Sequence, residues 1–361
     1  MSEKFITTDK LYVGVDLHKT QFTTCILTGP PDNQRELEAG TKYCMNKDGY
    51  QSFIGTLHEI SKQENNAKVV LAIESTANAR FFRDTMKRQG FEVQVVNTLR
   101  FKVVNLSTKK TDKNDAKTLA YFLSRNLLPQ SHLCSAEMEG IRRILKSRSL
   151  MVQDAVALKN QAHAILLAYG IVTRPTQFQS RTSRDKLLMR LPAKVRSILA
   201  TLFESLNTVE TQTRNLERHL RALTARDPRV NLLMTIPGIG IVNACIINSY
   251  TDDINRFETY KNYSAYCGLV PWVQTSNESV YYGRITKRGP QELRTALVQC
   301  VVAMVRMPDK TSNYSLMKQY QRLKEEKSSG KAIIAIARRL SRIIYIMLKT
   351  MTPFDGAKLI N

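Results

Sequence analysis

Apolar and polar positions in the first 128 residues predict alternating strands and helices. Five short apolar runs predict strands at 11–15, 22–27, 42–45, 69–73 and 91–96. Apolar positions three or four residues apart predict helices at 48–62, 79–88 and 112–125. Three strands followed by helix, strand, helix, strand and helix is the order of an RNase H-like domain. We therefore expect an α/β fold for this part of the chain.

The next hundred residues have a helical pattern with a heptad repeat. Intervals of four and three residues separate Val195, Leu199, Leu202, Leu206, Val209, Thr213, Leu216, Leu220 and Leu223. This spacing predicts a helix that pairs with another helix, either at 141–167 of the same chain or in a second subunit. The segment 174–190 has Pro, Ser, Thr and Gln and few large apolar residues, so we expect a loop or linker there.

Four acidic residues lie where the predicted N-terminal elements end or begin. Asp16 and Glu74 each end a strand-like run, and Asp112 and Asp115 lie three residues apart at a helix start. Two strand tips and one helix face can converge. Carboxylate oxygens are ligands that Mg²⁺ prefers, and two such ions about 3.5–4 Å apart can hold the attacking and leaving oxygens of a phosphodiester. The pattern favours a two-metal phosphate-cutting site.

A structural role is the alternative for Asp112 and Asp115. Aspartate at a helix start is favoured by capping and by the helix dipole. Two like charges three residues apart repel, and Lys109, Lys110 and Lys113 could offset this repulsion on the surface, where we also expect these lysines to contact nucleic acid. The metal interpretation is better only because two strand-terminal acids accompany this pair.

The charge of the chain indicates which phosphate is involved. Its 54 Lys and Arg residues against 31 Asp and Glu give a formal net charge of +23, which predicts a nucleic acid partner bound in a salt-dependent way. The length of 361 residues and 43% hydrophobic content predict two or three domains. We find no long apolar run and no signal peptide, and we expect a soluble cytoplasmic protein without membrane contact.

Zinc is not expected. The six cysteines form no Cys-x-x-Cys pair, and the five histidines are scattered along the chain. We therefore interpret the cysteines as reduced thiols and expect no histidine-based metal site.

Two segments of the last third could contact phosphate. Gly238 and Gly240 lie in a turn before a predicted helix, where backbone N–H groups suit a phosphate oxygen, although a tight turn without a ligand explains them equally well. Further on, hydroxyl groups precede four cations, an arrangement that suits nucleophilic attack on a phosphodiester. The hydroxyls are those of Thr275, Ser276, Ser279, Tyr281 and Tyr282, and the cations are Arg284, Lys287, Arg288 and Arg294. The chemistry alone does not choose the nucleophile.

Several short motifs, in order along nearly the whole chain, resemble the transposases of insertion-sequence family one-ten, relatives of the pilin-gene invertase Piv. The motifs are Val13-Gly-Val-Asp-Leu-His-Lys19, Ala72-Ile-Glu-Ser-Thr76, Lys110-Thr-Asp-Lys-Asn-Asp-Ala116, Ile236-Pro-Gly-Ile-Gly240, Cys267-Gly-Leu-Val-Pro271 and Gly283-Arg-Ile-Thr-Lys-Arg-Gly289.

The resemblance implies three domains: a RuvC-like DEDD domain at 1–130, a helical coiled-coil region at 131–227, and a mainly α C-terminal transposase domain at 228–361. It implies that Asp16, Glu74, Asp112 and Asp115 are the DEDD carboxylates and bind Mg²⁺. It also implies that Ser276 is the nucleophile that forms a 5′-phosphoserine link. In the family a Gly follows this serine, whereas Asn277 follows it here, so Thr275 and Ser279 stay as alternatives.

The resemblance further implies partners. They are donor and target DNA, a structured non-coding bridge RNA that chooses the sequence, and further copies of the chain in a homodimer or homotetramer. Oligomerisation through the heptad repeat is favoured, because a recombinase holds more than one DNA strand. Nucleoid association follows when the protein is on DNA. Two other hypotheses are a metal-dependent, junction-resolvase-like nuclease and a non-catalytic nucleic-acid-binding protein.

Overall fold

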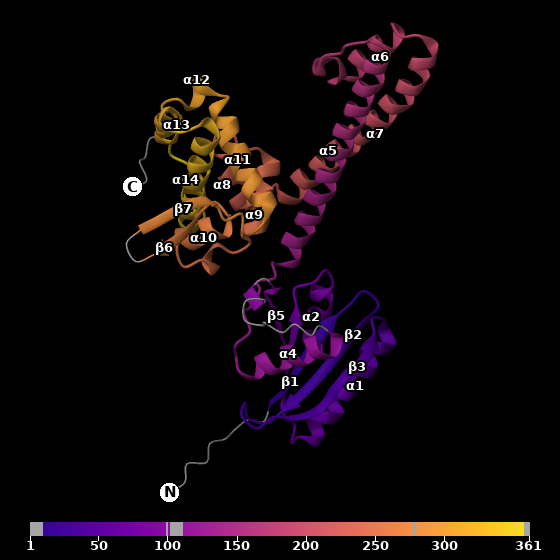
Figure 1. Ribbon diagram of the computed structural model, residues 1–361, viewed down its shortest axis with the longest axis vertical. Helices are drawn as coiled ribbons and strands as arrows, with labels where there is room; N and C mark the ends of the chain where they lie inside the picture. The colour runs from indigo at the N-terminus through magenta and orange to yellow at the C-terminus, as the bar shows by residue number, and fades with distance from the viewer. Residues whose placement is uncertain (1–9, 99, 102–110, 277–278, 357–361) are drawn as a thin grey trace. The chain divides into compact units, whose positions relative to one another are not determined.

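The computed structural model describes residues 10–98, 100–101, 111–276 and 279–356, and divides the chain into two compact units, Met1–Leu133 and Cys134–Asn361. Figure 1 labels the elements of each unit. The first unit is mixed α/β and the second is mostly helical. The division into three domains stays a prediction.

A five-stranded sheet with the order β3-β2-β1-β4-β5 forms the centre of the first unit. The strands are β1 (Lys10–Leu17), β2 (Gln21–Thr28), β3 (Arg35–Cys44), β4 (Lys68–Glu74) and β5 (Glu92–Val96). The first three are antiparallel neighbours, and β4 and β5 run parallel to β1. All five predicted strands are confirmed. Strand β3 is longer than the apolar run at 42–45, because it is an edge strand whose other residues are mostly polar or partly exposed.

Helices cover both faces of this sheet. Helices α1 (Lys47–Gln63) and α2 (Ala79–Arg88) pack on the face that receives Leu11, Val13 and Val15 of β1. Helix α4 (Asp112–Ser124) packs on the opposite face. Side chains of a strand alternate between faces, so the even-numbered residues of β1 and β4 point toward α4.

A long helical hairpin begins the second unit. Helices α5 (Ala136–Ala168) and α7 (Ala193–Thr224) lie side by side, as Figure 1 shows in magenta and rose. The heptad repeat of α7 is buried at Val195, Leu199 and Leu206 by residues of its own chain. Of the two predicted pairings, the structure shows the one within the chain, between α7 and α5. The heptad repeat by itself therefore no longer favours pairing between subunits.

The expectation of a loop at 174–190 is wrong. This segment forms a 3-10 turn, η1 (Pro175–Phe178), and helix α6 (Arg181–Met189), which closes the end of the hairpin. Helix α6 buries Leu187 and Arg184. Arg184 is only 2% exposed, so a charged residue occupies a position where the sequence pattern suggests solvent.

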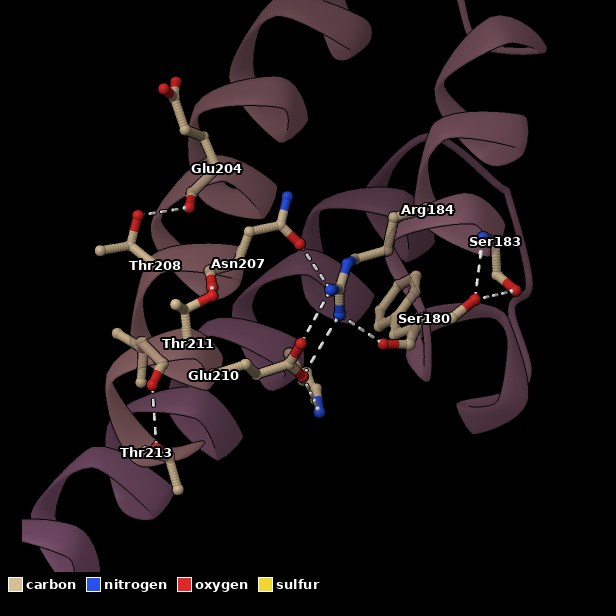
Figure 2. Close-up of polar contacts among 12 residues, drawn as sticks. Ser180, Ser183, Arg184, Glu204, Asn207, Thr208, Glu210, Thr211 and Thr213 are labelled. Atoms are coloured by element: carbon tan, nitrogen blue, oxygen red, sulfur yellow. Dashed lines mark hydrogen bonds and ion pairs between the residues drawn. The ribbon is translucent and has the colours of Figure 1, made fainter. Parts of the chain in front are cut away.

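Three groups accept hydrogen bonds from the two terminal nitrogens of the Arg184 guanidinium, whereas its buried Nε has no partner among the described residues (Figure 2). The terminal nitrogens donate to the carbonyl oxygen of Phe178 at 2.8 Å, to Oε2 of Glu210 at 2.8 Å and to Oδ1 of Asn207 at 2.5 Å. Lys159 of α5 reaches the other carboxylate oxygen of Glu210 at 2.9 Å. A buried charge persists only with such partners, and the network joins α5, α6 and α7.

The remainder of the second unit packs around its last helix. Its elements are α8 (Pro228–Met234), α9 (Ile241–Thr251), η2 (Ile254–Arg256), α10 (Tyr260–Tyr266), β6 (Pro271–Ser276), β7 (Ser279–Ile285), α11 (Gln291–Val305), α12 (Pro308–Thr311), α13 (Ser315–Glu326) and α14 (Ser329–Thr350). Helix α14 contacts α8, α10, α11 and α13. None of the helices in the described residues is long and apolar enough to span a membrane.

Candidate active site

A glycine allows the end of β1 to lie directly against helix α4. A Cβ atom on Gly14 would lie 1.9 Å from the carbonyl oxygen of Ala116 and 2.6 Å from the amide nitrogen of Ala120. No residue with a side chain permits that approach to backbone atoms. Asp16 follows two residues later and points to the same side of the sheet. The sequence therefore places Asp16 beside the first turn of α4, which carries Asp112.

Asp16, His18 and Asp112 form a cluster at this edge of the sheet. The Nε2 atom of His18 lies 3.0 Å from Oδ2 of Asp16 and 3.4 Å from Oδ1 of Asp112. Ligand atoms of these three residues all lie within 4.8 Å of one another. Lys42 of β3 approaches the other oxygen of Asp112 at 3.8 Å. Two of the four predicted acids are thus brought together by a shared histidine.

The surroundings of Asp16 disfavour its negative charge. Burial is the main cause that raises its pKa; His18 opposes this, and the nearby charges of Asp115 and Asp112 raise the pKa further. A divalent cation bound between acids that lie this close together would reduce the repulsion between their negative charges.

The other two acids belong to the same edge. Strand β4 runs beside β1, and Val15 pairs with Ile73 one residue before Asp16 and Glu74. Strand alternation puts Glu74 on the α4 side of the sheet, and its side chain is half-buried. Asp115 is half-buried on α4 and acts electrostatically on Asp16. The elements therefore collect all four acids at one sheet edge.

His18 is a member of the cluster that the sequence analysis missed. It lies in the turn after β1, where its backbone N–H donates to the carbonyl oxygen of Gln21 at 2.9 Å. Its own carbonyl oxygen accepts from the Asn78 side chain at 2.8 Å, and Asn78 in turn accepts from the Thr76 hydroxyl at 2.8 Å. No sequence signal singled it out, because His18 lies in a turn just beyond the end of β1 and has no second histidine near it.

The lysines before and within α4 were predicted to contact nucleic acid. Lys109 and Lys110 lie outside the described residues. Lys113 is exposed, but its methylene groups lie over Gly40 of β3, where a Cβ atom would be 3.0 Å from Cδ of Lys113. Lys113 therefore packs on the sheet through its stem and presents its charge to solvent.

Ser276 is the last residue of β6, and its backbone is in register with Ser279 of β7. The side chains of Thr275, Ser276 and Ser279 lie outside the described part of the chain. The choice among these hydroxyls thus stays a prediction.

The four predicted cations in and after β7 differ in their roles. Arg284 and Lys287 line a groove of the second unit. Arg294 donates to the carbonyl oxygen of Lys287 at 3.0 Å, so it also holds the turn that carries Lys287. Arg288 is exposed on that turn. A Cβ atom on Gly289 would lie 1.9 Å from the carbonyl oxygen of Tyr266, which explains the glycine by packing.

The turn at Gly238 and Gly240 precedes α9. Gly238 has φ +85°, and a Cβ atom there would lie 3.0 Å from the carbonyl oxygen of Cys300 in α11. Gly240 is the N-cap of α9, is exposed, and would have no atom near an added Cβ. Backbone conformation and close packing therefore account for Gly238, whereas Gly240 stays a predicted phosphate contact.

Comparison with known proteins gives two family matches. A family model for DEDD transposases of IS110 type, described as "Transposase", matches residues 13–171. A second model, described as "Transposase IS116/IS110/IS902 family", matches residues 230–320. The first match contains the acidic edge and the second contains the β6–β7 hairpin.

Similar curated proteins cover most of the chain. The transposase for insertion sequence element IS1328 of Yersinia enterocolitica is 28% identical over 79% of this chain and 85% of its own length. A probable family 20 transposase of Pseudomonas aeruginosa is 26% identical over the same shares. The pilin gene-inverting protein of Moraxella lacunata is 24% identical over 96% of this chain and 98% of its own. With the two family matches, these relatives show that the chain belongs to the IS110 family of transposases.

Proposed function

We propose that this transposase is an RNA-guided DNA recombinase that cuts and rejoins donor and target DNA. Asp16, Glu74, Asp112 and Asp115 would hold Mg²⁺, and Ser276 would be the nucleophile. The observation that carries the proposal is the cluster of Asp16, His18 and Asp112 at the sheet edge of the region that matches the DEDD transposase model. The strand order β3-β2-β1-β4-β5 supports an RNase H-like assignment for this unit.

The residues at this edge fit a divalent cation. Carboxylate oxygens are hard ligands of the kind Mg²⁺ takes. Burial, together with the charges of Asp115 and Asp112, raises the pKa of Asp16, so a bound cation would stabilise its charged form. When bound, the ion would supply Lewis-acid stabilisation of a phosphodiester oxygen. The chain's own part is to hold the carboxylates at fixed positions through the packing of Gly14 against α4 and the hydrogen bond from Asn78 to the His18 turn.

Attack by Ser276 would keep the energy of the broken bond for rejoining. Its Oγ forms a bond to phosphorus, the bond from phosphorus to the 3′ oxygen breaks, and the hydroxyl proton leaves to solvent while the 3′ oxygen is protonated. The product is a 5′-phosphoserine link and a free 3′-hydroxyl. The position of Ser276 at the end of a β-strand followed by cations supports this role. We propose further that the serine acts at the acidic site of a neighbouring copy in a dimer or tetramer.

Guidance by a structured RNA is the third part of the proposal. The net charge of +23 exceeds what solubility requires and suits a protein that holds RNA and DNA by their backbones. Base pairing between RNA and DNA would then choose the sequence.

A nuclease that uses water is the competing function, because the cluster of Asp16, His18 and Asp112 lies entirely within the first unit. Labelled DNA incubated with the protein, Mg²⁺ and the element's RNA separates the two on a denaturing gel. The recombinase forms a covalent protein–DNA adduct that Ser276→Ala abolishes and Ser279→Ala retains. Free 5′-phosphate ends without an adduct would support the nuclease. An adduct that survives in Ser276→Ala would assign the attack to Thr275 or Ser279.

A further inference from the structure

A large basic groove lies between the β6–β7 hairpin and helix α14 of the second unit. Its volume is about 1250 Å³. Small-molecule sites usually measure about 300–1,000 Å³ and are mostly apolar. Eight lysine and arginine side chains line this groove, and no aspartate or glutamate of the described residues does. Size and charge together indicate a polyanion rather than a metabolite.

Helix α14 supplies one wall as a regular stripe. Lys331, Ala335, Arg338 and Arg342 follow one another at intervals of four, three and four residues, so they share a helix face. The opposite face is buried in the core of the unit. From Lys331 to Arg342 the helix rises about 16 Å, which corresponds to about five nucleotide steps of a B-form strand. The stripe is thus long enough to follow several phosphates.

Three cations on this wall have no carboxylate partner within the described part of the chain. They are Lys331, Arg338 and Arg339. Partial burial lowers the pKa of Arg339, and the positive charge of the nearby Arg322 lowers it further. Such a wall gains energy when a phosphate chain displaces its counterions.

The hairpin supplies the opposite wall with both cations and aromatic rings. Arg284 and Lys287 face the groove together with Tyr281 and Tyr282. The two tyrosines are 64% and 67% exposed, so most of each ring is open to a ligand. Trp272 lies beside Tyr281 with ring centroids 6.4 Å apart. Exposed rings among cations are the features by which proteins stack unpaired bases while they hold the backbone.

We propose that this groove binds a single DNA strand, namely the strand whose phosphate Ser276 attacks. The identification of that strand rests on the proposed function, because β7 lines the groove and pairs with β6, whose last residue is Ser276. Cations of α14 hold the phosphates, and the tyrosines of β7 stack on the unpaired bases next to the cut.

Binding of the full-length chain to a fluorescein-labelled DNA of about 20 nucleotides tests this, measured by anisotropy in EDTA so that no cutting occurs. The double variant Lys331→Gln, Arg338→Gln removes two exposed cations of the stripe. Each phosphate contact contributes about 0.7 to the salt slope for single strands, so the slope falls by about 1.4 and affinity at about 0.1 M salt falls about 25-fold. The control Lys194→Gln, Arg218→Gln removes two exposed charges of α7 and keeps the wild-type slope.

Stacking is tested separately at the hairpin. Tyr281→Ala weakens binding of the single strand about five-fold or more, while Tyr281→Phe keeps it, because the ring and not the hydroxyl makes the contact. A duplex of the same sequence loses less affinity than the single strand in Tyr281→Ala.

Three results would overturn the proposal: an unchanged salt slope in the α14 variant, an equal loss in the α7 control, or a loss confined to RNA of the same sequence. The last result would assign the groove to the guide. Failure of the proposed chemistry gives a different pattern. In that case Ser276→Ala still forms adducts, while the α14 variant binds single-stranded DNA more weakly than the wild type. Adducts lost in Ser276→Ala with binding intact in the α14 variant would refute the groove alone.

Discussion

Replacing Gly14 by alanine tests how the fold positions the acidic edge. The added Cβ would lie 1.9 Å from the carbonyl oxygen of Ala116, and ordinary contact begins at 3.4 Å, so α4 must retreat by about 1.5 Å. The atoms in the way belong to the helix backbone and cannot rotate aside. Overpacking of this kind costs about 1–3 kcal/mol. Helix α4 carries Asp112 and Asp115, and a misplacement of about 1 Å can lower a rate about 100-fold.

We expect Gly14→Ala to lower both the melting temperature of the first unit and the Mg²⁺-dependent cleavage of DNA. Gly55→Ala is the matched control, because an added Cβ in the middle of α1 would meet no atom within 4 Å. Alanine there should stabilise by about 0.5–1 kcal/mol and leave cleavage unchanged. Differential scanning calorimetry and a gel-based cleavage assay measure the two effects. Equal stability and equal cleavage in the two variants would refute the reasoning.

Four further predictions concern other parts of the chain. Arg184→Met should destabilise the helical hairpin by about 3 kcal/mol in urea unfolding, because it leaves the Glu210 carboxylate with one cation fewer. Burial acts to raise the pKa of Glu210, but hydrogen bonds from Arg184 and Lys159 lower it overall. The ionised Glu210 therefore stabilises the folded protein fully above pH 4.5, and this stabilisation is lost as the pH falls through the lower pKa of the folded state. The pH-dependent loss of stability should be smaller in Arg184→Met. Gly238→Ala should cost about 1–3 kcal/mol and Gly240→Ala less than about 1 kcal/mol in thermal unfolding, and equal costs would contradict the packing argument. Asn78→Ala should lower Mg²⁺-dependent cleavage about tenfold with little loss of stability, since it frees the turn that carries the cluster histidine.

Much of the first unit follows from its sequence pattern. Apolar runs that end in an acid predicted the strands that carry Asp16 and Glu74, because buried strands need continuous apolar residues. The helix that carries Asp112 and Asp115 was predicted from its apolar spacing and its acidic first turn. Pairing of β1 with β4 then brings the two strand ends to one edge.

Other features depend on tertiary contacts that one-dimensional patterns do not contain. Helix α6 was missed because one of its two buried residues is the charged Arg184, whose partner Glu210 lies 26 residues away in α7. His18 was missed because a single histidine in a turn carries no ligand spacing of its own. The basic stripe on α14 becomes a groove wall only because the β6–β7 hairpin lies opposite.

The central claim is that a divalent cation binds where Asp16, His18 and Asp112 meet. Iron(II) substituted for Mg²⁺, with ascorbate and hydrogen peroxide, generates hydroxyl radicals that break the peptide backbone near the bound ion. The account predicts breaks close to residues 16, 74 and 112–115, which excess Mg²⁺ suppresses and Asp16→Asn removes. Breaks elsewhere in the chain, or the same breaks in Asp16→Asn, would contradict it.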